Sequence, residues 1–315
     1  MPISRAFTDE QLKSLIAMRQ DGEEYSTIVR MLTEVYKLKT SVEAVRRAFN
    51  NYGPQFGAKR PNKTKVAAER RPIAKRIRKG KEDNSSVLVI SDMHIPYHHP
   101  DAVAFLAAVK AKYKPTRIVC IGDEVDHHAL SFHDSDPNLM SAGDELQAAI
   151  KALQPIYKLF PVVDIVDSNH GSMAYRKGKH HGIPRKYLRD YGDVLEAPPG
   201  WVWSHDLTIT LPTGNQCYFH HSLGADVMKV VSQRGTCVVH GHHHTKFNIG
   251  YTGNPDSLLW GLMTGCLIDR YSMAFAYDNT NLGRPIVGVS IIIDGLPKLL
   301  PMTLKKGGRW NGSVP

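Results

Sequence analysis

The sequence has no long hydrophobic run and few cysteines. No apolar stretch approaches the roughly 18 residues needed to span a bilayer, and residues 1–21 lack the basic-then-apolar order of a signal peptide. The four cysteines, Cys120, Cys217, Cys237 and Cys266, are isolated and contain no C-x-x-C pair. This pattern favours free thiols over disulfides or a thiolate zinc site. We therefore expect a soluble protein of the cytoplasm with no membrane partner.

Acidic residues are almost absent from one segment. Residues 58–81 contain eleven Lys/Arg and a single acid, Glu69. Their excess of ten positive charges equals the formal net charge of the whole chain, +10, so the remainder is balanced. The segment belongs to a region, 54–86, whose prolines and glycines predict a linker. A basic linker of this kind is typical of an arm that tracks nucleic-acid phosphates, and a solvated tail is the alternative.

Residues 1–53 predict a module of three short helices. Thr8 and Gln11 have capping-box spacing at the start of the first helix, and Thr40 and Glu43 have the same spacing at the start of the third. The apolar faces are predicted from Leu12, Leu15 and Ile16, from Ile28, Val29, Leu32 and Val35, and from Val42, Val45 and Phe49.

The third predicted helix carries side chains suited to nucleic acid. Arg46, Arg47 and Asn50 lie on its expected outer side, where Arg and Asn can contact base edges or phosphates. Short helices with a turn before the last resemble a helix-turn-helix, closest to the Myb-like or homeodomain-like variety. We expect this module to bind nucleic acid, DNA in particular. A small three-helix domain that binds protein is the alternative.

A β-α-β unit is predicted in the middle of the chain. Residues 87–90 and 118–121 are short, β-branched runs bounded by loop residues, as buried parallel strands are, and residues 100–113 between them have helical spacing. Polar residues follow each run: Asp92 and His94 after the first, and Asp123 and Asp126 after the second. Open α/β sheets build their sites at such strand ends.

Similar clusters follow later strands. Predicted strands at 162–166, 216–219 and 236–239 each run into polar residues. These are Asn169 and His170, then His220 and His221, then His242 and His244. A lone histidine says little in a chain with 16 of them. The order D-x-H, G-D-x-x-D, N-H, H and G-H-x-H, each after an apolar strand, predicts one shared metal site.

In this order of motifs, residues 87–304 resemble the calcineurin-like metallophosphoesterase superfamily, and the loop at 122–146 is most similar to phage-encoded members. The resemblance implies an α/β fold, an α+β sandwich of two mixed sheets flanked by helices. It would follow the small all-α module and the linker. Residues 305–315 are expected to form a frayed tail.

The resemblance also implies two ion sites that share Asp123. One ion would take Asp92, His94, Asp123 and His244, and the other Asp123, Asn169, His242 and either His220 or His221, with His221 favoured by its position. His170 matches the superfamily's catalytic histidine, and Asp126 matches the carboxylate that orients it. Three positions depart from the family pattern: Ser168 and Ser222 replace glycines, and Gly171 replaces an acid.

Carboxylate, imidazole and amide ligands without thiolate suit two divalent ions, Mn by preference and Fe, Zn or Mg otherwise. A hydroxide bridging the two ions is expected to attack phosphorus in line. His170, oriented by Asp126, is expected to protonate the leaving oxygen. His128, His133 and Arg176 are candidates for substrate contact.

The leading hypothesis is a metal-dependent nuclease that hydrolyses phosphodiester bonds in nucleic acid, DNA rather than RNA. The polycationic segment decides it, because a small-substrate enzyme has no physical use for such an arm. The alternatives are a phosphomonoesterase or a small-molecule or cyclic-nucleotide phosphodiesterase, and a DNA-binding regulator with an inactive esterase body.

Overall fold

A computed structural model describes residues 7–20, 25–52, 82–131, 138–253, 255–272 and 283–315. The chain divides into two compact units, 1–70 and 71–315. The predicted basic arm at 58–81 lies outside the described residues, as does His133, and both remain predictions. Within the described ranges, no helix combines the length and apolar character that a membrane crossing requires.

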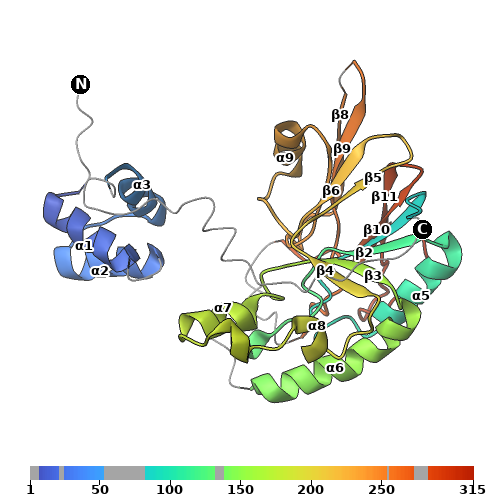
Figure 1. Cartoon of the computed structure of the whole chain (residues 1–315), viewed down its shortest axis with the longest axis horizontal. Coiled ribbons are helices and arrows are strands. Elements are labelled where there is room, and N and C mark those ends of the chain that lie inside the picture. The colour runs from blue at the N-terminus through green and yellow to red at the C-terminus, as the bar shows by residue number, and fades with distance from the viewer. Residues whose placement is uncertain (1–6, 21–24, 53–81, 132–137, 254, 273–282) are drawn as a thin grey trace. The chain divides into compact units, whose positions relative to one another are not determined.

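The described part of the first unit is a small helical bundle (Figure 1). It consists of α1 (Asp9–Gln20), α2 (Tyr25–Tyr36) and α3 (Val42–Tyr52). The predicted capping box of α1 is formed, because Thr8 N donates to Gln11 Oε1 at 2.9 Å and Gln11 N donates to Thr8 Oγ1 at 3.3 Å. Leu12, Leu15 and Ile16 of α1, Ile28 and Leu32 of α2, and Val45 and Ala48 of α3 form the core.

Two details of this unit differ from the sequence prediction. Ser41, not Thr40, caps α3, because its Oγ accepts from Ala44 N at 3.2 Å. Val35 and Val42 are 65% and 39% exposed rather than inward, since one lies in the last turn of α2 and the other begins α3, beyond the shared core.

The second unit contains a sheet of six strands, called here the first sheet. Its order is β11 (Leu296–Pro301), β10 (Gly288–Ile293), β1 (Ser86–Ile90), β2 (Arg117–Cys120), β3 (Val163–Val166) and β4 (Trp201–Ser204). The strands from β1 to β4 run parallel, and β10 and β11 are antiparallel neighbours that turn at Asp294 and Gly295.

A second sheet of five strands packs against the first. Its order is β5 (Leu207–Thr210), β6 (Gln216–Phe219), β7 (Cys237–His240), β9 (Leu258–Met263) and β8 (Asn248–Gly253). The pairs β6–β7 and β7–β9 are parallel, and the outer pairs are antiparallel. Both sheets are therefore mixed.

Successive side chains of β1 point to opposite faces of the first sheet, and this alternation explains why both faces are covered. Val87 and Val89 point into the core between the two sheets, with Phe219 and Val239 of the second sheet. Leu88 and Ile90 point the other way, into a core shared with α5 (Ala102–Tyr113) and α6 (Ala142–Leu159). On the second sheet α9 (Val227–Arg234) contacts β7 and β9. The result is the predicted sandwich of two mixed sheets flanked by helices (Figure 1).

Short helices lie between the strands of the first sheet. They are η2 (His128–Leu130), α7 (Met173–His180), η3 (Arg185–Tyr187) and α8 (Tyr191–Val194).

The four cysteines are free and buried, in line with the expectation of unpaired thiols.

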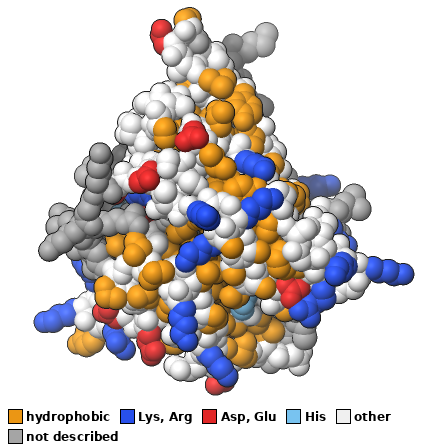
Figure 2. All heavy atoms as spheres, turned by 90° about the vertical axis from the view of Figure 1, so that its right-hand side faces the viewer, with side chains coloured by type: hydrophobic (Ala, Val, Ile, Leu, Met, Phe, Trp, Pro, Cys, Tyr) orange, Lys and Arg blue, Asp and Glu red, His pale blue; other side chains and the backbone are white. Residues whose placement is uncertain are grey.

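Residues 305–315 are docked and not frayed. The Trp310 ring lies 5.6 Å from the ring of Phe105 on α5, and Trp310 N donates to Asp101 Oδ2 at 2.9 Å. An aromatic side chain in this segment supplied contact area that its glycine content did not reveal. Figure 2 shows the face on the side of α5 and the C-terminus, where apolar side chains and Lys/Arg intermix with scattered Asp/Glu.

Candidate metal centre

The candidate ligands lie just beyond strand ends of both sheets. Asp92 and His94 follow β1, Asp123 follows β2, Asn169 and His170 follow β3, His221 follows β6, and His242 and His244 follow β7. Four of these residues have left-handed backbone conformations, with φ of 50° at Asp92, 48° at His94, 48° at Asp123 and 66° at His242. Such conformations are costly for residues other than glycine and cluster at functional sites.

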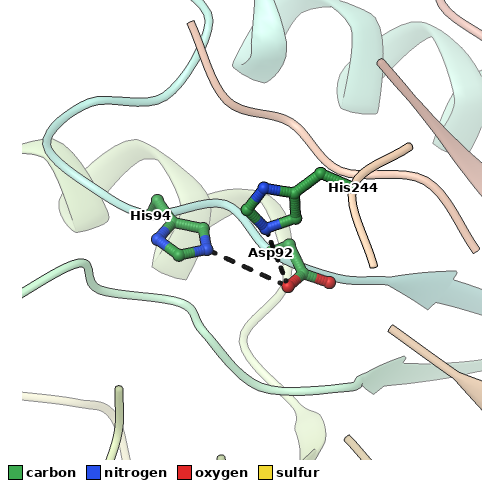
Figure 3. Close-up of side chains that lie close together, drawn as sticks. All are labelled: Asp92, His94 and His244. Atoms are coloured by element: carbon green, nitrogen blue, oxygen red, sulfur yellow. Dashed lines mark ion pairs between the residues drawn. The ribbon is translucent and has the colours of Figure 1, made fainter. Parts of the chain in front are cut away.

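The first group joins one loop of each sheet (Figure 3). His244 Nε2 lies 3.3 Å from Asp92 Oδ1, and His94 Nε2 lies 3.9 Å from the same oxygen. Asp92 and His94 are buried. One ligand atom from each of the three residues lies within 4.8 Å of the others, as a shared ion requires.

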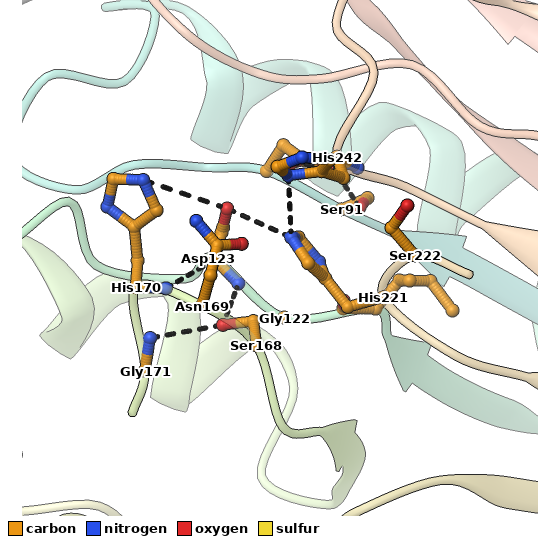
Figure 4. A network of polar contacts seen from close by, with 12 residues as sticks. Ser91, Gly122, Asp123, Ser168, Asn169, His170, Gly171, His221, Ser222 and His242 are labelled. Atoms are coloured by element: carbon orange, nitrogen blue, oxygen red, sulfur yellow. Dashed lines mark hydrogen bonds and ion pairs between the residues drawn. The ribbon is translucent and has the colours of Figure 1, made fainter. Parts of the chain in front are cut away.

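The second group surrounds Asp123 (Figure 4). His221 Nε2 lies 3.1 Å from Asp123 Oδ2 and 3.2 Å from His242 Nδ1. The same carboxylate oxygen lies 3.6 Å from His94 Nε2 and 4.0 Å from His170 Nε2. Asp123 thus belongs to the second group and also lies close to His94 of the first, and its role as a bridging ligand remains a prediction.

Two buried oxygens make the site suitable for cations. Asn169 Oδ1 is buried and accepts no hydrogen bond from the part of the chain that the structure describes, and the buried Asp123 Oδ2 has histidine nitrogens around it, with His221 Nε2 nearest at 3.1 Å. A buried acceptor without a hydrogen bond is costly. A divalent ion would satisfy both oxygens, and oxygen and imidazole donors without thiolate suit Mn, Fe, Zn or Mg.

The electrostatics of the site favour charged ligands. Burial alone would raise the pKa of Asp123, but nearby His221 and His170 hold it well below its usual range. Conversely, burial would lower the pKa of His221, but Asp123 raises it to about 9. His221 Nδ1 donates to the main-chain oxygen of Ile121 at 2.8 Å, which points Nε2 at Asp123 and fixes the tautomer.

Two small residues hold the ligand loops together. A side chain at Gly241 would lie 2.5 Å from Asp92 Oδ2, and its absence lets His242 N donate to that oxygen at 2.9 Å. Ser168 Oγ accepts from Asp123 N at 2.9 Å and from Gly171 N at 3.1 Å. Ser168 therefore ties the β2 and β3 loops together. From the sequence, Ser168 stands out only as a departure from the family's glycine, because no sequence pattern reports such a contact.

Asp126 contacts two histidines through different groups. Its carboxylate Oδ1 accepts from His94 Nδ1 at 2.5 Å. Its main-chain carbonyl accepts from His170 Nδ1, while Oδ1 lies 3.8 Å from that nitrogen. The predicted carboxylate partner of His170 thus has His94 as its closer neighbour. Burial lowers the pKa of His170, although Asp123 and Asp126 oppose this.

Of the two adjacent histidines, His221 faces the centre. The ring of His220 stacks on Tyr218 with centroids 6.0 Å apart, and its Nδ1 accepts from Ser222 N at 3.1 Å. The Nδ1 of His220 therefore takes part in a local turn with Ser222. The geometry favours His221 over His220, and the ligand role itself remains a prediction.

The candidate substrate contacts fall into separate places. Arg176 Nη2 donates to the main-chain oxygen of Asn169 at 2.8 Å, and His128 Nδ1 lies 3.9 Å from Asp126 Oδ2, so both adjoin the centre. In the first unit, Arg46 and Arg47 are exposed and lie 3.4 and 3.2 Å from Glu43, while the side chain of Asn50 is outside the described residues.

Comparison with known proteins gives no family assignment. The sequence matches no family model and no curated protein. Among solved structures, vacuolar protein sorting 29 from Cryptosporidium parvum is similar at 13% identity and a TM-score of 0.41, over 73% of this chain and 94% of that one. Chaetomium thermophilum Vps29 is similar at 11% identity and 0.37, over 73% and 96%. The nuclease MPE of Pseudomonas putida is similar at 13% identity and 0.29, over 68% and 86%.

Proposed function

We propose that this chain is a phosphoesterase of the calcineurin-like metallophosphoesterase superfamily that hydrolyses phosphodiester bonds in DNA with two divalent ions, Mn by preference. The observation that carries the proposal is the pair of possible ligand groups that meet at Asp123, together with a buried amide oxygen, Asn169 Oδ1, that accepts no hydrogen bond from the described residues. Metal ions neutralise charge on phosphoryl oxygens and lower the pKa of a bound water, the chemistry that hydrolysis at phosphorus needs.

The chain's own residues would hold the ions in two sets. Asp92, His94 and His244 would form one set, and His221, His242 and Asn169 the other, with Asp123 shared by both. The spacing supports the grouping of Asp92 with His94 and His244, and of Asp123 with His221 and His242. Asp126 positions His94, and Ile121 positions His221, each through the ring nitrogen that faces away from Asp123. Such contacts orient ligand rings and raise their basicity.

His170 is the proposed proton donor to the leaving oxygen. Its Nδ1 donates to the carbonyl of Asp126, so the proton that comes and goes is the one on Nε2, 4.0 Å from Asp123 Oδ2. The side chain is 21% exposed, which leaves room for a substrate. A histidine within reach of the leaving group supplies general acid catalysis.

Three features support a nucleic-acid substrate. The segment 58–81 carries the excess charge of the chain. The three-helix unit presents Arg46 and Arg47 on the surface, as a helix-turn-helix would. Residues 168–189, which begin beside His170, contain six Lys/Arg and no acid. Positive surface of this kind neutralises phosphates. A cytoplasmic enzyme, phage-encoded and acting in its host, is part of the same proposal.

The test compares substrates and a matched pair of variants. Purified protein with Mn is given supercoiled plasmid, single-stranded oligonucleotide and p-nitrophenyl phosphate in parallel. We expect cleavage of nucleic acid, lost in Asp123→Asn and kept in Asp294→Asn, whose aspartate lies in the exposed β10–β11 turn.

Other outcomes favour the alternatives. Turnover of the small ester without cleavage of either nucleic acid would favour the phosphomonoesterase. If the protein bound DNA but no metal, and its DNA binding were the same in Asp123→Asn, the result would favour the inactive regulator.

A further inference from the structure

A cavity of about 240 Å³ lies beside the candidate metal centre. Its wall is shared by α6, α7 and α8, which lie on one side of the second unit in Figure 1. The inner end is formed by buried residues, His127, Gly171 and Tyr191. His127 and Gly171 follow Asp126 and His170 directly in the chain, so the cavity adjoins the proposed catalytic residues.

The chemistry of the cavity suits a flat, partly polar ring. Leu146, Leu188 and Val194 supply apolar wall, and Tyr175 supplies an aromatic ring. At the inner end, His127 Nε2 lies 2.9 Å from the hydroxyl of Tyr191, which gives the apolar wall a polar edge. A cavity of about 150 Å³ lined by apolar side chains already admits benzene. The larger space here has room for a nucleobase.

The charge that lines the cavity is positive on balance, because two arginines line it against one acid, Asp190, whose carboxylate accepts from Gly192 N at 3.1 Å. The two arginines, Arg185 and Arg189, are exposed, which places them at the opening. They end the run of six Lys/Arg without an acid that starts after His170. Guanidinium groups bind phosphates in a planar, two-point manner. An apolar recess with arginines at its mouth is the arrangement that a nucleotide, with its flat base and charged backbone, complements.

We propose that this cavity binds one unpaired base of a nucleic-acid strand, within a few nucleotides of the bond that the metal centre cleaves, while Arg185 and Arg189 hold the adjoining phosphates. The inference rests on the proposed function for the class of substrate, and it adds the place where the protein binds that substrate. A strand bound in this way must expose a base, so single strands, strand ends or flipped bases would be bound in preference to intact duplex.

The experiment measures binding in EDTA, so that no turnover occurs. A fluorescein-labelled single-stranded hexanucleotide is displaced from the full-length protein by six competitors, each lacking one base at a different position. All have the same number of phosphates, so the basic arm contributes equally to each. We expect loss of the base at one position to weaken binding about tenfold, the usual effect of one stacked base, and loss at the others to matter little.

Two variants locate the effect. Ala174 is exposed on α7 and lines the cavity, so Ala174→Trp fills it from the surface. This variant should bind the intact hexanucleotide about tenfold more weakly than the parent, with no position then special. Ala111→Trp, an exposed alanine on α5 that does not line the cavity, should behave like the parent.

The results separate this proposal from the proposed function. Equal binding of all six competitors by the parent, or unchanged binding by Ala174→Trp, overturns the base-binding cavity even if the protein cleaves DNA with Mn. A single sensitive position that disappears in Ala174→Trp supports it even if no cleavage is found. Displacement by a phosphotyrosine peptide together with equal binding of the six competitors would assign the cavity to a protein ligand instead.

Discussion

Replacing Asp126 by Asn tests which histidine its carboxylate positions. Oδ1 of this carboxylate lies 2.5 Å from His94 Nδ1 and 3.8 Å from His170 Nδ1. His170 Nδ1 donates to the main-chain carbonyl of Asp126, which the substitution leaves in place. We therefore expect Asp126→Asn to loosen His94, a proposed metal ligand, and to leave His170 oriented.

The size of the effect follows from the contact. Partners of metal-binding histidines contribute about tenfold to hundredfold to metal affinity. Asp126 and His94 are 3% and 2% exposed, so solvent screens their hydrogen bond little. A bond to an ionised acceptor is roughly twice as strong as a neutral one, and the amide of Asn keeps only the neutral form. Mn affinity should therefore fall by about tenfold to hundredfold, while kcat at saturating Mn stays close to that of the parent.

The assay is cleavage of a single-stranded oligonucleotide, whose alkoxide leaving oxygen needs a proton, as a function of Mn concentration, with Mn binding measured separately by calorimetry. His170→Gln is the contrasting variant, because it should lower kcat by about a hundredfold or more at every Mn concentration, the usual weight of a general acid, without weakening Mn binding. If Asp126→Asn bound Mn like the parent and lost kcat as His170→Gln does, the carboxylate would be acting on His170, and our account of its contacts would be wrong.

Three further predictions concern single residues. His221→Gln should reduce bound Mn and abolish activity, whereas His220→Gln should leave both near the parent values, as metal analysis and the same assay would show. Arg117→Met removes a buried guanidinium whose Nε lies 2.8 Å from Asp164 Oδ2, so urea unfolding should report a loss of about 3–5 kcal/mol, and a loss below about 1 kcal/mol would contradict this. Burial lowers the pKa of His221, but Asp123 raises it from 6.5 to about 9. In EDTA, protonated His221 should therefore stabilise the folded protein fully below pH 6.5, and this contribution should be lost as pH rises through 9. Melting temperature should fall over that window, and less so in His221→Gln.

The positions of the candidate ligands could be predicted from the sequence because few variables fix them. A short buried run followed by a polar residue defines a strand end, and parallel neighbours bring their carboxyl ends to one edge. Asp92 and Asp123 meet these conditions on β1 and β2, and His242 meets them on β7. The helix at 100–113, observed as α5, was predictable for a similar reason, since apolar periodicity fixes which face is buried.

Contacts that depend on side-chain orientation could not be predicted. The division of Asp126 between two histidines depends on which way each ring turns, and no residue pattern carries that information. The cap of α3 is a comparable case, because Thr40 and Ser41 both offer a hydroxyl near its start. With Ser41 as the cap, Ala44 occupies the third helical position, so Glu43 is out of register for a capping box and lies instead 3.4 and 3.2 Å from Arg46 and Arg47.

Contacts between segments that lie far apart in the sequence also could not be predicted. Trp310 packs on α5 some two hundred positions earlier in the chain, and the cavity beside His170 takes its walls from α6, α7 and α8. Each segment looks unremarkable alone, since a glycine-rich tail and a basic loop are usually solvated. Only their packing gives them a role.

Both sheets contribute ligands to the candidate metal centre. Asp92, His94 and Asp123 come from loops of the first sheet, and His221, His242 and His244 from loops of the second. Each proposed ion would therefore take ligands from both sheets, so binding would link the two layers at the edge where the apolar core ends. An ion that binds only the folded state stabilises it by mass action. The left-handed loop residues and the buried Asn169 Oδ1, which has no hydrogen-bond partner among the described residues, cost stability without the ions, and ion binding would offset that cost at the place where it arises.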